Sequence, residues 1–288
     1  MQTWTIRKLI TWTAEWFKNF DIATPRLDAE ILLSHTINCT RLDLYLDPDK
    51  PVTDTERAAF RSHIKRRANR EPIAYIIGSK EFWGRNFSVD PRVLIPRPET
   101  ETLIEAALSK IPEKAPWLVA DLGTGSGCIA ITIALEKPDV KVIASDISAG
   151  SIEVAKMNAF NLGASDRIMW RQGSWCTVFN SLIQPKSLDL LLTNPPYIAS
   201  GELLELQPEI SKYEPDIALD GGKDGLQAYK ELVQEAVFWL KSGSWIIMEI
   251  GYRQGEDIKG ILKEASFVSI EIIKDASGKD RVISAMKP

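Results

Sequence analysis

The chain has 288 residues, of which 44% are hydrophobic and 26% are charged, as in a globular protein that buries a sizeable core. Its formal net charge is −4, from 35 basic and 39 acidic residues, which argues against a surface built to bind phosphate backbones over its whole extent. A local basic patch stays compatible with this charge.

The cysteines and the N-terminus carry further expectations. The spacing of Cys39, Cys128 and Cys176 fits no zinc pattern, so we expect no metal site and reduced thiols. Acidic residues interrupt the first 30 positions, and no window approaches 18 apolar residues. We therefore expect neither a standard signal peptide nor a membrane-spanning helix, and a cytoplasmic location.

Residues 1–80 are predicted to form a small helical-bundle domain. Apolar residues recur at helical spacing from Trp4 onward, and residues 53–56 have the capping-box pattern that begins a helix. That helix carries a basic run without an acid between its members: Arg57, Arg61, Lys65, Arg66, Arg67 and Arg70. We interpret the run as a solvated face, with a docking face for an acidic or RNA-containing partner as the alternative.

The character of the sequence changes at residues 81–96. Apolar and polar residues alternate around Phe82-Trp83-Gly84 and Phe87-Ser88-Val89, which predicts a short β-hairpin. Prolines at positions 91, 96 and 98 mark its exit. We place the linker between two domains here, so that the second domain spans residues 97–288.

Strand and helix patterns alternate in this second domain. Helices are predicted over residues 99–111, from the glycine loop to about 136, 151–162 and 224–241. The predicted strands are 117–122, 141–146, 167–172, 188–193, 244–250, 267–273 and 281–286. This alternation predicts an α/β fold, with a mostly parallel seven-stranded sheet between two layers of helices. The last two strands are too close in sequence for a helical crossover and should pair antiparallel.

A glycine loop follows the first of these strands and begins a helix. Gly123, Thr124, Gly125, Ser126 and Gly127 let the backbone turn sharply and approach a ligand closely. The GxGxG spacing differs from the GxGxxG of dinucleotide-binding proteins, and the Lys-Ser/Thr of a P-loop is missing. Nicotinamide dinucleotides and nucleoside triphosphates are therefore disfavoured as ligands.

Asp146 ends the second strand of this domain. It lies 146 − 125 = 21 residues beyond Gly125, a spacing at which a carboxylate can accept hydrogen bonds from both hydroxyls of a ribose. The alternative is that Asp146 is the N-cap of the following helix.

The tetrapeptide Asn194-Pro195-Pro196-Tyr197 follows the strand at residues 188–193, where open α/β sheets bind their ligands. The Asn194 side-chain oxygen and a backbone carbonyl can accept both hydrogens of a planar NH2 group, and Tyr197 can stack on its flat face. The prolines fix the backbone and offer no competing N–H. With the glycine loop and Asp146, this corner indicates S-adenosylmethionine, which carries an adenosine and a sulfonium but no phosphate. No strong base is evident at this corner.

Over most of its length, from about residue 25, the chain resembles the peptide-chain release factor glutamine methyltransferases. The stretches that carry the resemblance are 26–30, 71–75, 93–101, 121–127, 194–198, 214–215, 221–226 and 249–251. The resemblance implies a Rossmann-like domain that transfers a methyl group from S-adenosylmethionine, leaving S-adenosylhomocysteine. The acceptor would be the side-chain amide nitrogen of the glutamine in the Gly-Gly-Gln motif of class I release factors.

The resemblance also implies roles for individual residues. It assigns catalysis to Asn194 and Tyr197, and binding of the substrate amide to residues 194–197. The implied cofactor contacts are Gly123, Thr124, Gly125, Ser126, Gly127, Asp146, Trp175 and Asn194, with no metal. Trp175 would lie near the adenine, and its alternative is a core aromatic residue. We expect a monomer whose helical domain binds the release factor, without direct binding of nucleic acid.

The residues alone leave two other functions open. An adenine-N6 methyltransferase would apply the same tetrapeptide to a flipped base; the net charge of −4 and the lack of an evident target-recognition domain disfavour it, and the basic helix favours it. The second is a binding protein with a degenerate cofactor fold, which the intact Asp146, Asn194 and Tyr197 disfavour.

Overall fold

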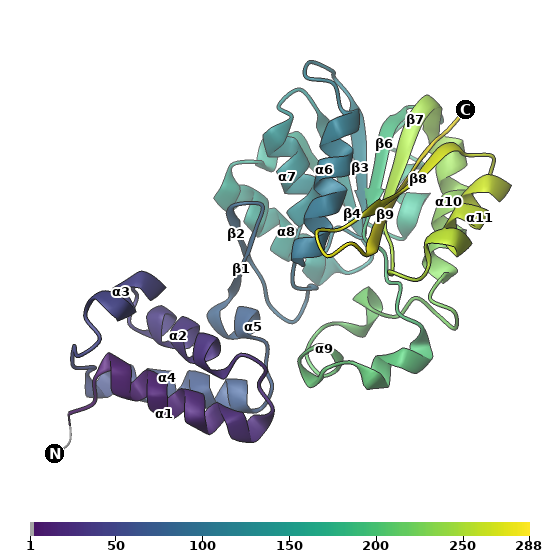
Figure 1. The fold of residues 1–288 in the computed structure, drawn as a ribbon. Helices are drawn as coiled ribbons and strands as arrows, with labels where there is room; N and C mark the ends of the chain where they lie inside the picture. The colour runs from purple at the N-terminus through teal and green to yellow at the C-terminus, as the bar shows by residue number, and fades with distance from the viewer. Residues whose placement is uncertain (1–2) are drawn as a thin grey trace. The chain divides into compact units, whose positions relative to one another are not determined.

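A computed structural model describes residues 3–288, so the first two positions of the predicted helical domain lie outside the described residues (Figure 1). The chain forms two compact units. The first comprises the residues up to Gly78 together with Gln207–Tyr213, and the second comprises Ser79–Leu206 and Glu214–Pro288. Within residues 3–288, no helix is long and apolar enough to cross a lipid bilayer.

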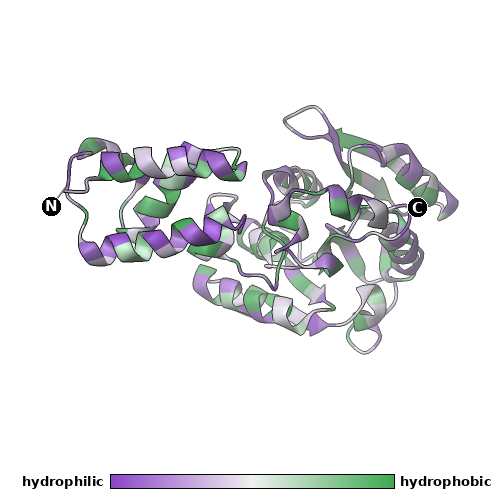
Figure 2. Ribbon diagram, turned by 90° about the horizontal axis from the view of Figure 1, so that it is seen from below, coloured by the Kyte–Doolittle hydropathy of each residue, from purple (hydrophilic) through white to green (hydrophobic). Residues whose placement is uncertain are grey.

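The first unit is helical, as the sequence predicts. Its helices are α1 (Ile6–Phe17), α2 (Pro25–Thr36), α3 (Arg41–Leu46), α4 (Asp54–Ala68), α5 (Ile73–Ile77) and, from the distant segment, α9 (Pro208–Ser211). Apolar and hydrophilic residues alternate along these helices (Figure 2), which bury one face around Phe17, Leu32 and Phe60. The predicted capping box is confirmed: the Thr53 hydroxyl accepts the Glu56 N–H, and the Glu56 carboxylate accepts the Thr53 N–H.

The basic run on α4 and in the turn after it is largely neutralised inside this unit. Arg67 is only 6% exposed and donates from Nε to Asp28 Oδ2 at 2.7 Å. The other ion pairs of the run are Arg67–Glu209, Arg57–Asp54, Arg66–Glu71 and Arg70–Glu209. The interpretation of the whole run as a solvated face is wrong for Arg67, which Asp28 of α2 and Glu209 of α9 neutralise in the interior. The alternative of a docking face stays a prediction. Arg61 and Lys65 are exposed.

The second unit begins with the predicted hairpin, formed by β1 (Ser79–Phe82) and β2 (Arg85–Ser88) in antiparallel pairing. The two loop residues, Trp83 and Gly84, both have left-handed φ angles. This is the pattern of a type I′ turn, whose twist matches that of two-stranded ribbons.

A seven-stranded sheet forms the centre of this unit, in the order β5-β4-β3-β6-β7-β9-β8. The strands are β3 (Leu118–Leu122), β4 (Lys141–Asp146), β5 (Ile168–Gln172), β6 (Leu188–Thr193), β7 (Leu240–Glu249), β8 (Val268–Lys274) and β9 (Asp280–Met286). The first five strands of the order are parallel, whereas β9 is antiparallel to both β7 and β8. The predicted α/β fold and the antiparallel final pair are confirmed.

Helices cover both faces of this sheet (Figure 1). One face carries α6 (Glu101–Lys110), α7 (Cys128–Glu136) and α8 (Ala149–Leu162), and the other carries α10 (Gln227–Trp239) and α11 (Gly255–Glu264). Short 3-10 turns lie at η1 (Lys18–Phe20), η2 (Pro98–Thr100), η3 (Ser165–Arg167), η4 (Trp175–Phe179), η5 (Ser200–Glu205) and η6 (Asp216–Ala218).

Two helix predictions need correction. The helix α10 begins three residues later than predicted, because the Asp224 carboxylate accepts the Leu226 N–H at 3.0 Å in the turn before it. We did not predict α11 from the sequence, because its buried side chains are only Ile258 and Leu262 in a mostly polar segment.

The buried ion pair of the first unit gives a stability test. Arg67→Met should lower the free energy of unfolding of this unit by about 3–5 kcal/mol, because it leaves the buried Asp28 carboxylate without its cation. Hydrogen exchange of the α2 amides, followed by mass spectrometry, measures the change. Lys65→Met on the exposed side of the same helix is the matched control and should have almost no effect. Equal protection in the two variants would contradict the assignment.

Candidate functional site

A cavity of about 380 Å³ opens at the carboxyl ends of the parallel strands, within the size range of sites for small ligands. Residues at the end of β4 and after β3, β4, β5 and β6 line it: Gly123, Gly125, Asp146, Ile147, Gly173, Ser174, Trp175, Asn194 and Pro196. The sheet order reverses between β3 and β6, where Leu122 pairs with Thr193. This register places Gly123 and Asn194 side by side at the switch point, the usual ligand position of such sheets.

The glycine loop is supported from behind by Asp121. Asp121 Oδ2 accepts the Thr124 hydroxyl at 2.6 Å and the Ala130 N–H at 3.1 Å. Complete burial raises the pKa of Asp121 to about 7, since the loss of hydration outweighs these hydrogen bonds. The loop glycines all have left-handed φ angles: Gly123, Gly125 and Gly127. The loop therefore requires glycine and is held rigid from inside the sheet.

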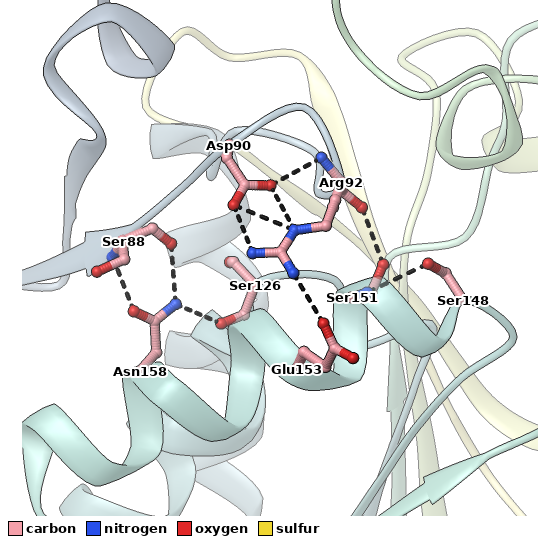
Figure 3. A network of polar contacts seen from close by, with 8 residues as sticks. All are labelled: Ser88, Asp90, Arg92, Ser126, Ser148, Ser151, Glu153 and Asn158. Carbon is pink, nitrogen blue, oxygen red and sulfur yellow. Dashed lines mark hydrogen bonds and ion pairs between the residues drawn. The ribbon is translucent and has the colours of Figure 1, made fainter.

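Asn158 holds the other side of the loop (Figure 3). Its Oδ1 accepts the Ser88 N–H at 2.7 Å, and its Nδ2 donates to the carbonyls of Ser88 and Ser126 at 3.0 and 2.9 Å. One buried amide thus joins the end of β2 to the glycine loop. Thr124 and Ser126 are themselves buried and, like Gly127, are not among the residues that line the cavity, which Gly123 and Gly125 reach from this loop.

Asp146 faces the cavity from the end of β4. Its Oδ2 accepts the Gly125 N–H and its Oδ1 accepts the Ser148 N–H, both at 2.9 Å. Burial raises the pKa of this carboxyl group. Because each oxygen has a further lone pair, the side chain can also accept from two hydroxyl groups. The alternative that Asp146 caps the next helix is wrong, since Ser148 is the N-cap of α8 and accepts the Ser151 N–H.

Trp175 lines the cavity beside the glycine loop. Its Nε1 donates to Glu231 Oε2 at 3.2 Å, and a Cβ at Gly123 would lie 3.8 Å from its Cζ3. Its φ of 39° is rare for a bulky residue and marks a constrained backbone. Trp175 also packs partly against the core beneath α10, so it combines a core contact with a place on the cavity wall.

Arg92 is the basic residue on the cavity wall in the described part of the chain. Its guanidinium pairs with Asp90 at 2.7 Å and with Glu153 at 2.9 Å, and its carbonyl accepts the Ser151 hydroxyl at 3.0 Å (Figure 3). With its charge neutralised by two carboxylates, Arg92 is a poor phosphate ligand. Among residues 3–288, no three His, Cys, Asp or Glu side chains are grouped so that they could hold a metal ion.

The lining therefore fits an adenosine with a sulfonium better than a phosphate. It offers backbone at left-handed glycines, one carboxylate with spare lone pairs and one indole face. The carboxylate matches the hydroxyls of a ribose, and the indole face matches the flat ring of an adenine.

The tetrapeptide after β6 is a rigid corner. The Thr193 hydroxyl donates to the Leu122 carbonyl at 2.6 Å, just before the corner. After it, the Tyr197 carbonyl accepts Gln254 Nε2 at 3.0 Å. Gly221 packs so closely that an added Cβ would lie 2.8 Å from the Pro196 carbonyl oxygen. Asn194 and Pro196 reach the cavity, whereas Pro195 is buried and Tyr197 is half-buried beside them.

Two buried residues lie behind this corner, Thr100 and Glu249, and the sequence alone predicted no role for them. Asn194 Nδ2 donates to Thr100 Oγ1 at 3.4 Å, and Thr100 Oγ1 donates to Glu249 Oε2 at 2.6 Å. Tyr197 Oη lies 3.5 Å from Glu249 Oε1. Burial raises the pKa of Glu249 to about 7 and that of Tyr197 to about 12. An acid at the end of the apolar strand β7 is the signal that could have drawn attention to Glu249.

Comparison with known proteins gives matches in both units. The profile of the PrmC N-terminal domain matches residues 8–78, and that of the methyltransferase small domain matches residues 100–210. A release factor glutamine methyltransferase of Geobacter sulfurreducens is 40% identical over 286 residues, covering 98% of this chain and 96% of the relative. One of Neisseria gonorrhoeae is 42% identical over 258 residues, covering 90% and 92%.

A solved structure is also similar. It is the protein-(glutamine-N5) methyltransferase (release factor-specific) of Alicyclobacillus acidocaldarius, 29% identical, with a TM-score of 0.41. The match covers 70% of this chain and all of the other.

The close packing of the glycine loop is testable. In Gly127→Ala the new Cβ would lie 2.9 Å from Ile131 Cδ1 and 3.1 Å from Ala155 Cβ. Gly163 has a similar left-handed φ but open surroundings, so Gly163→Ala reports the backbone strain alone. We expect Gly127→Ala to lower the free energy of unfolding by about 1–3 kcal/mol more than Gly163→Ala, as measured by urea denaturation. Equal losses would show that the loop tolerates a side chain.

Proposed function

Because the chain belongs to the family of release factor glutamine methyltransferases, we propose that it methylates the side-chain amide nitrogen of the glutamine in the Gly-Gly-Gln motif of class I peptide chain release factors. The methyl donor is S-adenosylmethionine, and S-adenosylhomocysteine is the second product. The observation that supports this most is the position of Asn194, at the cavity wall beside the glycine loop.

The cofactor contacts come from Asn194 and from the cavity wall beside it. The backbone at Gly123 and Gly125 lets a ligand approach closely, and the Asp146 carboxylate accepts its ribose hydroxyls. Trp175 offers the flat contact for an adenine. Thr124, Ser126 and Gly127 keep the loop in shape from behind. When bound, S-adenosylmethionine supplies the methyl group as an electrophilic carbon on a sulfonium.

The part of the site that binds the methyl acceptor needs residues that make an amide nitrogen reactive. The nitrogen lone pair of a glutamine amide is delocalised into its carbonyl group. The Asn194 side-chain oxygen and the Pro195 carbonyl accept the two N–H bonds, which favours positive charge on that nitrogen as its bond to carbon forms. Tyr197 stacks on the flat amide and keeps it in the cavity. The nitrogen then loses one proton to solvent.

Two energetic effects lower the barrier to methyl transfer. Holding both reactants at contact distance removes roughly 7–11 kcal/mol of the barrier. A fixed acceptor aimed at developing charge contributes about 3–4 kcal/mol more, by analogy with oxyanion holes. The rigid corner suits this role, because its acceptors need no reorganisation during the reaction.

The function is tested with the full chain, S-adenosylmethionine and a class I release factor. Mass spectrometry should find one added methyl group on the glutamine of the Gly-Gly-Gln motif. A release factor with that glutamine replaced by alanine is the control and should gain none. Parallel incubations with DNA and RNA test the adenine-N6 alternative; methylated adenine, with an unmodified release factor, would overturn the proposal.

Asn194→Ala should lower kcat by about 100- to 1,000-fold, the range seen when one preorganised polar group is removed. Affinity for S-adenosylhomocysteine, measured by calorimetry, should fall much less than kcat, because the glycine loop, Asp146 and Trp175 still bind the cofactor. Tyr197→Phe should be much milder, because the ring that stacks on the amide is retained. Methylation by Asn194→Ala at the wild-type rate would contradict its role, and a loss in Tyr197→Phe as large as that in Asn194→Ala would assign the hydroxyl a direct part.

A further inference from the structure

We propose that Thr100 and Glu249 are positioning residues that fix which end of the Asn194 carboxamide faces the substrate. This inference rests on the proposed function, because it concerns the orientation of the acceptor that binds the glutamine amide. An asparagine side chain has a donor end and an acceptor end, and a turn of 180° exchanges them. The reaction needs the oxygen toward the cavity.

The orientation follows from a chain of hydrogen bonds with one direction. A carboxylate can only accept hydrogen bonds, so the Thr100 hydroxyl donates its single hydrogen to Glu249 Oε2, at 2.6 Å. Toward Asn194, Thr100 Oγ1 is then left only with lone pairs. It can accept from the Asn194 NH2 group, 3.4 Å away, but cannot donate to its oxygen. The Asn194 oxygen is therefore directed away from Thr100 and is free for the substrate.

Both residues act from behind the wall and do not touch the substrate themselves. Thr100 is 2% exposed and Glu249 is 1% exposed, and the cavity is lined by Asn194 in front of them. Glu249 is also held at its backbone, where its carbonyl accepts the Tyr229 hydroxyl at 2.8 Å. Its second oxygen faces Tyr197 Oη. One buried carboxylate thus lies behind both polar side chains of the corner.

The charge of Glu249 is what gives the chain its direction. A protonated Glu249 carries a donor of its own and leaves Thr100 free to donate to the Asn194 oxygen, so both orientations of the amide become possible. Burial raises the pKa of Glu249 to about 7. The fraction of correctly oriented Asn194, and with it kcat, should therefore fall as the pH decreases through about 7.

Other ionisable groups near Glu249 do not produce this change. The groups that face it are Glu99 on η2, Cys128 on α7, Tyr197, Tyr229 on α10 and Arg281 on β9. Burial raises the pKa of Tyr197 and of Cys128 to about 12, and Arg281 stays charged. Glu99 is exposed, so Glu99→Gln serves as a control for the pH profile.

Variants of Thr100 test the orientation directly. Thr100→Val removes the acceptor for the Asn194 NH2 group at constant volume, and kcat should fall by about tenfold, the effect of one lost orienting hydrogen bond. KM for the release factor and affinity for S-adenosylhomocysteine should stay near the wild-type values. Thr100→Ser keeps the hydroxyl and should restore kcat. Thr132→Val is the matched control, because the buried Thr132 hydroxyl has no hydrogen-bond partner in the described residues, and it should leave kcat unchanged.

The dependence of kcat on pH is a measurement that a purely structural role of Glu249 would leave unchanged. In wild type, kcat should rise severalfold with a midpoint near pH 7. In Glu99→Gln the same rise should persist with a lower midpoint, because the Glu99 charge raises the pKa of Glu249. In Glu249→Gln, kcat should stay at the low level, because an amide carries its own donor at every pH. Any change that remains near pH 7 belongs to Asp121 behind the glycine loop, whose pKa burial also raises to about 7. This comparison also holds if Thr100→Val fails to fold.

The outcomes separate this inference from the proposed function. A wild-type protein that leaves the release factor unmethylated overturns the function itself. A wild type that methylates normally, together with wild-type kcat in Thr100→Val or, at high pH, in Glu249→Gln, overturns only the role of Thr100 and Glu249.

Discussion

Parallel pairing of β3 with β6 is the constraint on which the site depends. The register of Leu122 with Thr193 brings the glycine loop and the Asn194 corner to the same edge, where the sheet order reverses. A shift of one residue would turn every side chain of β6 to the opposite face and bury Asn194 in one of the cores. The buried leucines of β6 and the Thr193 hydrogen bond to the Leu122 carbonyl oppose such a shift. The two sides of the cavity are thus placed by the fold before any ligand binds.

Buried carboxylates then fix the loops that leave these strand ends. Asp121 supports the glycine loop, and Asp146 holds both Gly125 and Ser148. Glu249 lies behind Asn194 through Thr100 and faces Tyr197 directly. Burial of an acid is costly unless donors satisfy it. Thr124, Gly125, Ser148 and Tyr197 donate from the loops that carry the site. The same contacts that compensate the burial therefore keep the site in shape, which is the condition for preorganised acceptors to speed a reaction.

The sequence predicts those parts of the structure whose signal is local. The seven strands, the type of the final pair and the cavity positions of Gly123, Asp146 and Asn194 follow from residue patterns within short stretches. Contacts between distant residues could not be predicted in this way. Arg67 is neutralised by Asp28, 39 residues away, and Arg70 by Glu209, 139 residues away. For the same reason Thr100 and Glu249, 149 residues apart, gained a role only once the fold placed them behind Asn194.

The central claim is that the methyl donor and the substrate amide meet at Asn194. A crystal structure of the protein with S-adenosylhomocysteine and a peptide containing Gly-Gly-Gln measures this most directly. We expect the cofactor sulfur beside the Asn194 corner, with the Asn194 side-chain oxygen hydrogen-bonded to the glutamine nitrogen. A sulfur that lies away from Asn194, or a corner closed to the glutamine side chain, would contradict the claim.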